Sequence, residues 1–239
     1  MKKLYDKSEL LFSILWVVVY CVISASIRGS FGEGSIVLLI GLAAIAIGIF
    51  VFIKKFHLEK KYGLRKWHSN AKDYLYFVPV LILMTGNLWG GIEIAHKGMA
   101  QVFVVISMLL VGFIEELIFR GFLFRALLQK DPVPVAVTIS AATFGIGHIV
   151  NLLTGQGNLE TVFQILFAMA WGFLFTFLFY KTGSILVGVI VHGGVDVFSI
   201  FAAHEGGSEY GYVLAVLIVA IVYCVYLSRR PAALREETE

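Results

Sequence analysis

The chain has 239 residues, of which 59% are hydrophobic and only 15% are charged, and its mean hydropathy is +0.88. This composition excludes a water-soluble domain and a disordered chain, and it predicts an integral membrane protein. The formal net charge is only +3. No nucleic-acid partner is expected, because the basic residues serve membrane topology and contact with anionic lipid headgroups.

Eight apolar runs follow one another along the chain, each near the ~20 residues that a helix needs to cross a bilayer. They cover residues 10–27, 35–53, 74–92, 100–124, 133–153, 161–180, 184–203 and 211–228. The runs are continuously apolar and do not alternate with a period of two, which favours helices over a β-barrel. The first run is long and seven more follow, so we interpret it as an uncleaved helix. The sequence predicts an all-α, polytopic helical bundle of about eight transmembrane helices, forming a single membrane-embedded domain over residues 1–239.

Basic residues are distributed unevenly along these runs. With the N-terminus in the cytoplasm, the opposite side holds only Arg28 and Lys97 of the 19 Lys and Arg residues, and Arg120 lies inside a run. This asymmetry predicts that both termini are cytoplasmic. The short connections favour a bacterial cell membrane. Both cysteines, Cys21 and Cys224, lie within apolar runs, so neither a disulfide framework nor a cysteine metal site is expected.

The run 100–124 carries three charged side chains, Glu115, Glu116 and Arg120. Each ionised side chain at the centre of a spanning helix costs about 2.5–3.5 kcal/mol on insertion scales, so these groups must face protein or water. Glu116 and Arg120 are i,i+4 neighbours and can pair. Glu115 points about 100° away and has no partner in its own helix. It is therefore a candidate for acid–base chemistry.

Two later runs also carry ionisable groups at helical spacing. The segment AATFGIGHIV places Phe144 and His148 one turn apart, and VGVIVHGGVDVF places His192 and Asp196 one turn apart. One histidine in a helix is usually a packed, hydrogen-bonded residue. Ionisable groups on three different runs are best explained if they converge in one polar cavity.

Helix lengths give a first estimate of the depth of that cavity. At 1.5 Å per residue, Glu115 lies about 15 Å from a cytoplasmic edge near Arg125, and His192 lies about 12 Å from Ser184. His148 lies about 22 Å from Val133 and fits less well. This counting places the site in the cytoplasmic half of the membrane.

Three motifs in these runs resemble those of a known family. EELIFR fits EExxxR, FGIGH fits FxxxH and HGGVD fits HxxxN/D, in the order found in the CAAX protease and bacteriocin-processing family of intramembrane proteases, also called the Abi family. Each motif is weak alone, but three in order, each in its own run, are specific. The resemblance covers about residues 100–203, whereas the first three runs match only in being hydrophobic.

The resemblance implies a glutamate-dependent endopeptidase that hydrolyses a peptide bond of a membrane-associated or lipidated peptide or protein, without a cofactor. Glu115 with His148 would activate the attacking water. His192 with Asp196 would stabilise the oxyanion. The implied structural residues are Glu116 and Arg120, which would orient Glu115, and Phe144 of the second motif.

Asp196 departs from the family pattern, because members often have Asn at this position and Asn can donate a hydrogen bond to an oxyanion. An ionised Asp cannot donate. Either Asp196 is protonated, or it orients and charges His192, or the site holds a metal. The zinc alternative would use Glu115, His148, His192 and Asp196 as ligands. The chain has no HExxH motif, and we favour the metal-free hypothesis.

Two other functional classes stay open. In a proton-coupled transporter, the intramembrane Glu, His and Asp would form a relay, but the sequence shows no recognisable inverted repeat. A non-catalytic immunity or scaffold membrane protein would keep the fold and tolerate substitution of Glu115. Among the remaining polar and aromatic residues, Asn87 and Glu93 are expected to hydrogen-bond within the bundle or lie at the membrane interface. The aromatic residues of run 161–180 are expected to pack or face lipid.

Overall fold

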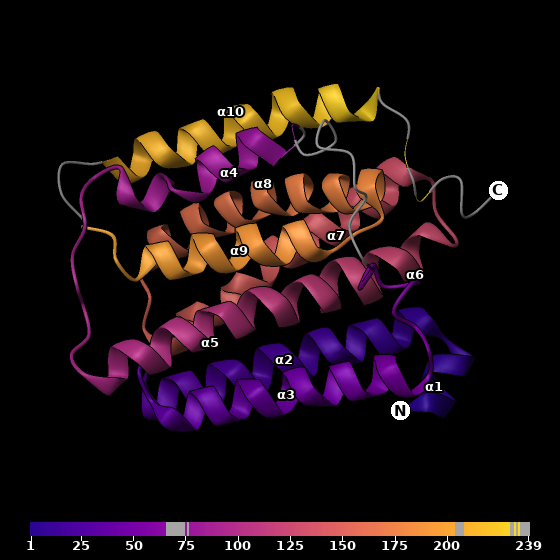
Figure 1. Ribbon diagram of the computed structural model, residues 1–239, viewed down its shortest axis with the longest axis horizontal. Coiled ribbons are helices and arrows are strands. Elements are labelled where there is room, and N and C mark those ends of the chain that lie inside the picture. Colours follow the sequence, from indigo (N-terminus) through magenta and orange to yellow (C-terminus); the bar gives the residue numbers. More distant parts are fainter. Residues whose placement is uncertain (66–74, 76, 204–207, 230–231, 233, 235–239) are drawn as a thin grey trace.

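The computed structural model describes residues 1–65, 75, 77–203, 208–229, 232 and 234 of the chain (Figure 1). These residues are helical apart from turns and one isolated β-bridge, Ile92–Ala202. The elements are α1 (Lys2–Lys7), α2 (Glu9–Phe31), α3 (Ile36–Lys55), α4 (Val78–Met84), η2 (Gly86–Leu88), α5 (Met99–Glu115), the π-helical η3 (Glu116–Phe124), α6 (Arg125–Leu128), α7 (Val133–Gly147), η4 (His148–Thr154), α8 (Asn158–Thr182), α9 (Leu186–Ser199) and α10 (Ser208–Ser228). The predicted all-α membrane bundle is confirmed.

Every predicted run contains a helix, but the helices differ in length. Among the described residues, six helices are long and apolar enough to cross a membrane: Glu9–Phe31, Ile36–Lys55, Met99–Leu128, Val133–Leu152, Asn158–Thr182 and Tyr210–Ser228. The helices of runs 74–92 and 184–203 are shorter, at Val78–Leu88 and Leu186–Ser199. In the first of these runs the chain turns after Leu88, where Gly91 has a φ of 115°. The apolar runs therefore predicted where the helices lie better than they predicted how long the helices are.

The bundle has two distinct ends (Figure 1). The N-terminus, α1 and α6 lie at one end, on the right of the view, which we call the termini end. Its connections are residues 56–65, 129–132 and 183–185. The opposite end, which we call the loop end, comprises residues 32–35, 89–98, 155–157 and 200–203. These loops are joined by backbone hydrogen bonds, from Glu93 N to Phe201 O at 2.9 Å and from Ala203 N to Gly91 O at 3.2 Å.

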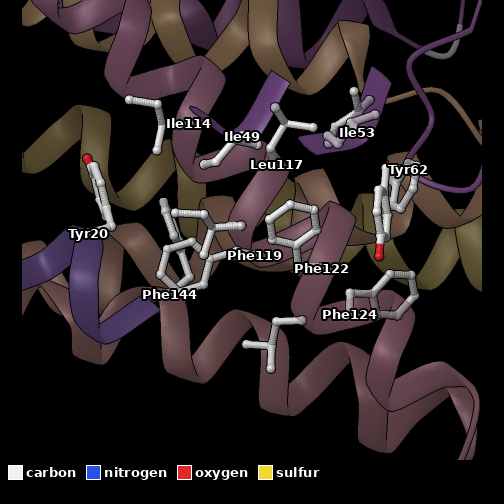
Figure 2. Close-up of a cluster of buried hydrophobic side chains, with 14 of the residues drawn as sticks. Tyr20, Ile49, Ile53, Tyr62, Ile114, Leu117, Phe119, Phe122, Phe124 and Phe144 are labelled. Atoms are coloured by element: carbon white, nitrogen blue, oxygen red, sulfur yellow. The ribbon is translucent and has the colours of Figure 1, made fainter. Parts of the chain in front are cut away.

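An aromatic core fixes the π-helical η3 against α2, α3 and the loop 56–65 (Figure 2). Phe122 of η3 packs edge-on against Phe12 of α2 at 5.1 Å and against Tyr62 at 4.8 Å between ring centroids. Figure 2 shows Tyr62 and Phe124 at one end of this cluster, and Tyr20 and Phe144 at the other. Buried aromatic rings contribute large apolar areas and prefer such edge-on geometry. The segment that carries the charged motif is thus held by aromatic packing along its length.

Helices α5 and α9 approach most closely at a pair of glycines. A Cβ on Gly112 would lie 2.6 Å from the backbone nitrogen of Gly193, whereas a Cβ on Gly193 would meet nothing closer than the Leu109 side chain at 3.3 Å. Both positions are glycines in apolar helices, but only Gly193 has room for a side chain. Small residues at such crossings let helix backbones meet.

We predict that Gly112→Ala separates α5 from α9 and lowers the melting temperature of the purified protein, because backbone atoms cannot move aside as a side chain can. Gly193→Ala is the matched control. It should be tolerated, since Leu109 can change rotamer and alanine favours helix by about 1 kcal/mol over glycine. Equal melting temperatures for the two variants in thermal unfolding would contradict this account of the crossing.

Candidate functional site

The three sequence motifs meet at one cavity of about 520 Å³. Glu115 ends α5, His148 follows α7, and His192 and Asp196 lie on α9. All four side chains line this cavity. The structure therefore brings together the four residues that the sequence nominated as catalytic.

The predicted pair of Glu116 and Arg120 forms and extends to a histidine. Arg120 Nη1 donates to Glu116 Oε1 at 2.8 Å, and the same oxygen lies 3.0 Å from Nδ1 of His192. Both charged side chains are fully buried, and the guanidinium lies 4.2 Å from the ring centroid of Phe144. Gly188 leaves room for the carboxylate, since a Cβ there would lie 2.6 Å from Glu116 Oε2. The structural motif thus fixes a histidine of another helix.

His192 is held by two aromatic rings and by a hydrogen bond at Nδ1. Its ring stacks on Phe175 at 5.4 Å and 24°, and Phe144 meets it edge-on at 5.4 Å. Because an ionised carboxylate only accepts hydrogen bonds, Nδ1 donates to Glu116. Nε2 then lies 3.6 Å from an oxygen of Glu115 and 3.6 Å from an oxygen of Asp196. Among the described residues, this Asp196 oxygen has no hydrogen-bond partner.

His148 presents its other nitrogen to the cavity. Its Nδ1 lies 3.1 Å from the carbonyl oxygen of Phe144, and since a carbonyl only accepts, Nδ1 carries the proton. In the neutral ring Nε2 is then a hydrogen-bond acceptor. Phe144, which packs against both imidazoles, lies 5.3 Å from the ring of His148. Phe144 therefore spaces the two histidines as well as orienting one of them.

The helix that carries Glu115 is longer than its predicted run, 100–124. It spans Met99–Leu128, so Glu115 lies about 20 Å from its termini end and about 24 Å from its loop end. His148, about 22 Å from Val133, is at matching depth. The helix extends beyond Arg125, the residue taken as its edge, so Glu115 lies deeper than predicted but still slightly nearer the termini end, and its place in the cytoplasmic half stays a prediction. Glu115 lies near the middle of its span.

Tyr20 of α2 was missed by the sequence motifs. Its hydroxyl donates to Glu115 Oε1 at 2.7 Å, and the Tyr20 side chain is buried. The family resemblance gave no signal in this run, which matched only in being hydrophobic. A tyrosine in the middle of an apolar run was the one available clue, because a buried phenol usually needs a hydrogen-bond partner.

A second cavity of about 790 Å³ meets the first at the same residues. The two share Phe144, His148, Gln164, His192, Asp196 and Ser199. We call the second the aromatic cavity, because its walls include Phe163, Phe167, Trp171, Phe175, Tyr210 and Tyr212, together with polar residues such as Asn87, Gln156 and Glu160. Phe175 was expected only to pack or face lipid, and it also supports His192. The site thus lies between a polar space and an aromatic one.

The two polar residues of the third run differ in role. Asn87 donates from Nδ2 to the carbonyl oxygen of Val195 at 2.9 Å, so its predicted hydrogen bond within the bundle is confirmed. Glu93 lines the polar cavity at the loop end. Of the other polar residues in connections, His68, His204 and Glu205 lie outside the described residues.

The zinc alternative would need several of these side chains to face one point. Within the part of the chain that the structure describes, no group of three or more His, Cys, Asp or Glu side chains is arranged to hold a metal ion. Nδ1 of both histidines is engaged, with Phe144 O and with Glu116, and Nε2 of each ring stays available. Histidines that bind zinc are commonly held in this way, so the metal-free mechanism stays a prediction.

Comparison with known proteins agrees with the motifs. Residues 97–198, which contain all three, match the family model of type II CAAX prenyl endopeptidase Rce1-like proteins. A relative, the uncharacterized protein YyaK of Bacillus subtilis (strain 168), is 31% identical over 107 residues. That match covers 44% of this chain and 34% of the relative, so the chain spans about a third of the relative's length. Over residues 97–198, this integral membrane protein is therefore similar to the Rce1-like family of type II CAAX prenyl endopeptidases, in agreement with the resemblance that its three motifs carry.

Proposed function

We propose that the protein is an intramembrane endopeptidase that hydrolyses a peptide bond of a membrane-associated or lipidated peptide. The observation that carries this proposal is the convergence of Glu115, His148, His192 and Asp196 on one cavity inside the bundle. Peptide hydrolysis needs a water, a base to deprotonate it, and a donor for the developing oxyanion. These residues can supply the base and the donor.

Glu115 is the proposed base. Its Oε1 is held by Tyr20 and its Oε2 faces His192. A water held between the Glu115 carboxylate and Nε2 of His148 would transfer a proton to Glu115 as its oxygen bonds to the carbonyl carbon. The carbonyl oxygen then carries the negative charge of a tetrahedral intermediate.

His192 is the proposed donor to that oxygen. When it is protonated, Nε2–H can donate to the oxyanion while Nδ1–H remains bonded to Glu116. Asp196 lies 3.6 Å from the same Nε2, which favours the interpretation that Asp196 orients and charges His192. The proton on Glu115 next passes to the amide nitrogen, the C–N bond breaks, and an amine and a carboxylic acid are formed; the acid keeps the second proton of the water and ionises on release. A site with little bulk water strengthens each of these interactions.

The test is cleavage of a mixed pool of hydrophobic and lipidated peptides by the protein in nanodiscs, detected by mass spectrometry. We expect products that persist in the presence of a zinc chelator, because the glutamate mechanism needs no metal. Loss of cleavage in chelator, restored by added zinc, would overturn the metal-free mechanism. No cleavage together with Glu115-dependent proton flux in liposomes would favour the transporter instead.

Tyr20→Phe is predicted to lower kcat by about tenfold, or about 1.4 kcal/mol in activation free energy, with KM unchanged. The phenol touches Glu115 and is assigned as a positioning residue, so its loss should affect the chemical step and not substrate binding. Tyr62→Phe is the matched control, since Tyr62 is equally buried in the same aromatic core (Figure 2) but at its far end. A rise in KM without a fall in kcat would contradict this role.

A further inference from the structure

A groove of about 630 Å³ lies on the outside of the bundle, between α2 and α3 and next to α1 (Figure 1). Among the described residues, none lines both this groove and either of the two cavities at the site. The groove is apolar along its length and basic at the termini end. Its apolar walls include Leu15, Val19, Val51 and Phe52, and its basic end is formed by Lys2 and Lys55.

The groove is open toward the hydrocarbon of the membrane. Leu15 and Val51 on its two sides are 38% and 53% exposed, and such side chains on spanning helices contact lipid tails. Its inner wall is Phe52, which stacks on Phe12 at 4.9 Å between ring centroids. Gly48 adds room, because a Cβ there would meet no atom within 4 Å. The space beside the backbone of α3 is therefore free for an acyl chain.

Two ammonium groups meet at the basic end of the groove. Nζ of Lys2 lies 5.0 Å from the ring centroid of Phe56, and Nζ of Lys55 lies 5.9 Å from the same point. Lys2 pairs with Asp6 one turn along α1, whereas Lys55 has no ion pair in the described part of the chain. Two cations beside one ring and one carboxylate leave a net positive charge. An anion bound between the lysines would reduce their repulsion.

We propose that this groove binds an anionic glycerophospholipid, with its phosphate between Lys2 and Lys55 and an acyl chain along Val51 and Gly48. The inference is independent of the proposed endopeptidase function. Lysine binds phosphate as a point charge, and Gly48 lies about 10 Å deeper along α3 than Lys55. A zwitterionic lipid could supply the same acyl chain, but it would bring a cation of its own toward the two lysines.

The bound lipid would support α2. This helix is among the least buried of the membrane-spanning helices. Val19 of α2 lines the groove, while the next residue, Tyr20, lines the polar cavity. A lipid in the groove would thus add contacts on a face of α2 that the described chain leaves open. Because it binds the folded chain, it should also raise the melting temperature by mass action.

Lipid binding is tested on the full chain in detergent, by native mass spectrometry with dioleoyl-phosphatidylglycerol and dioleoyl-phosphatidylcholine as probes. We expect Lys2→Gln/Lys55→Gln to lower the affinity for phosphatidylglycerol by about 25-fold, about fivefold for each lysine, and to leave that for phosphatidylcholine unchanged. The matched control is Lys3→Gln/Lys60→Gln, which removes two exposed lysines of the same end that do not line the groove. Equal affinity of the wild type for both lipids, or equal losses in the two double variants, would overturn the proposal.

Gly48→Leu tests the groove while keeping both lysines. The new side chain favours helix and fills the space proposed for the acyl chain. We expect weaker binding of phosphatidylglycerol and a smaller rise in melting temperature on its addition. Ala44→Leu is the control, since it adds bulk to an exposed position of α3 outside the groove. If Gly48→Leu binds phosphatidylglycerol as the wild type does, the lipid lies elsewhere and the inference fails.

Discussion

Glu115→Gln is expected to lower kcat for peptide cleavage by about 10²–10⁴-fold, because an amide cannot take up the proton of the attacking water. The fold should survive. Gln has nearly the same shape as Glu, and its Oε1 can still accept the hydrogen bond from Tyr20. The measurement is single-turnover cleavage in nanodiscs, with the melting temperature recorded on the same preparation.

The control for Glu115→Gln is Glu59→Gln, which removes a carboxylate at the termini end that pairs with Lys54 at 3.0 Å. It should keep wild-type cleavage. If Glu115→Gln cleaves at the wild-type rate, Glu115 is not the base. If the protein's cellular function also survives Glu115→Gln, the non-catalytic scaffold or immunity hypothesis becomes the better account.

Arg120→Met is expected to cost about 3–5 kcal/mol in the free energy of unfolding, because it leaves the buried carboxylate of Glu116 without its cation. The side chains of both residues are fully buried, so solvent cannot replace the lost partner. Glu116 also holds His192, so activity should fall together with stability. Reversible unfolding in mixed micelles measures the change in the free energy of unfolding.

The double variant Glu116→Gln/Arg120→Met separates charge burial from packing. It removes both charges, and the introduced amide keeps an oxygen that can accept from His192. We expect it to be more stable than Arg120→Met alone, since neutral replacement of a whole buried pair is often nearly neutral in stability. Equal or greater destabilisation in the double variant would show that packing of the guanidinium on Phe144 and Phe175 outweighs its charge.

The sequence was sufficient for the class of fold and for the motif residues that meet at the site. Lipid excludes unpaired charge, so Glu115, His148 and Asp196 on separate apolar runs had to face a common interior. Helical spacing gave the pairing of Glu116 with Arg120. These inferences succeeded because the bilayer and the periodicity of the helix are strong, local constraints.

Other features depend on how the helices pack, and the sequence did not show them. Tyr20 and Phe175 reach the site from helices without a motif, and Glu116 binds a histidine 76 residues away. The depth of Glu115 required the true end of its helix.

The polar and the aromatic cavity meet at the residues that they share, and this has a consequence for turnover. The two fragments of a cleaved peptide would differ in solubility, one in water and the other in lipid. The water-soluble fragment would already lie in the polar cavity, and the apolar fragment in the aromatic one. The hydrated fragment can diffuse into water while the apolar fragment dissolves laterally in the bilayer. Product departure would then be driven by partitioning, and reversal of the cleavage would be suppressed because the two fragments no longer share one phase.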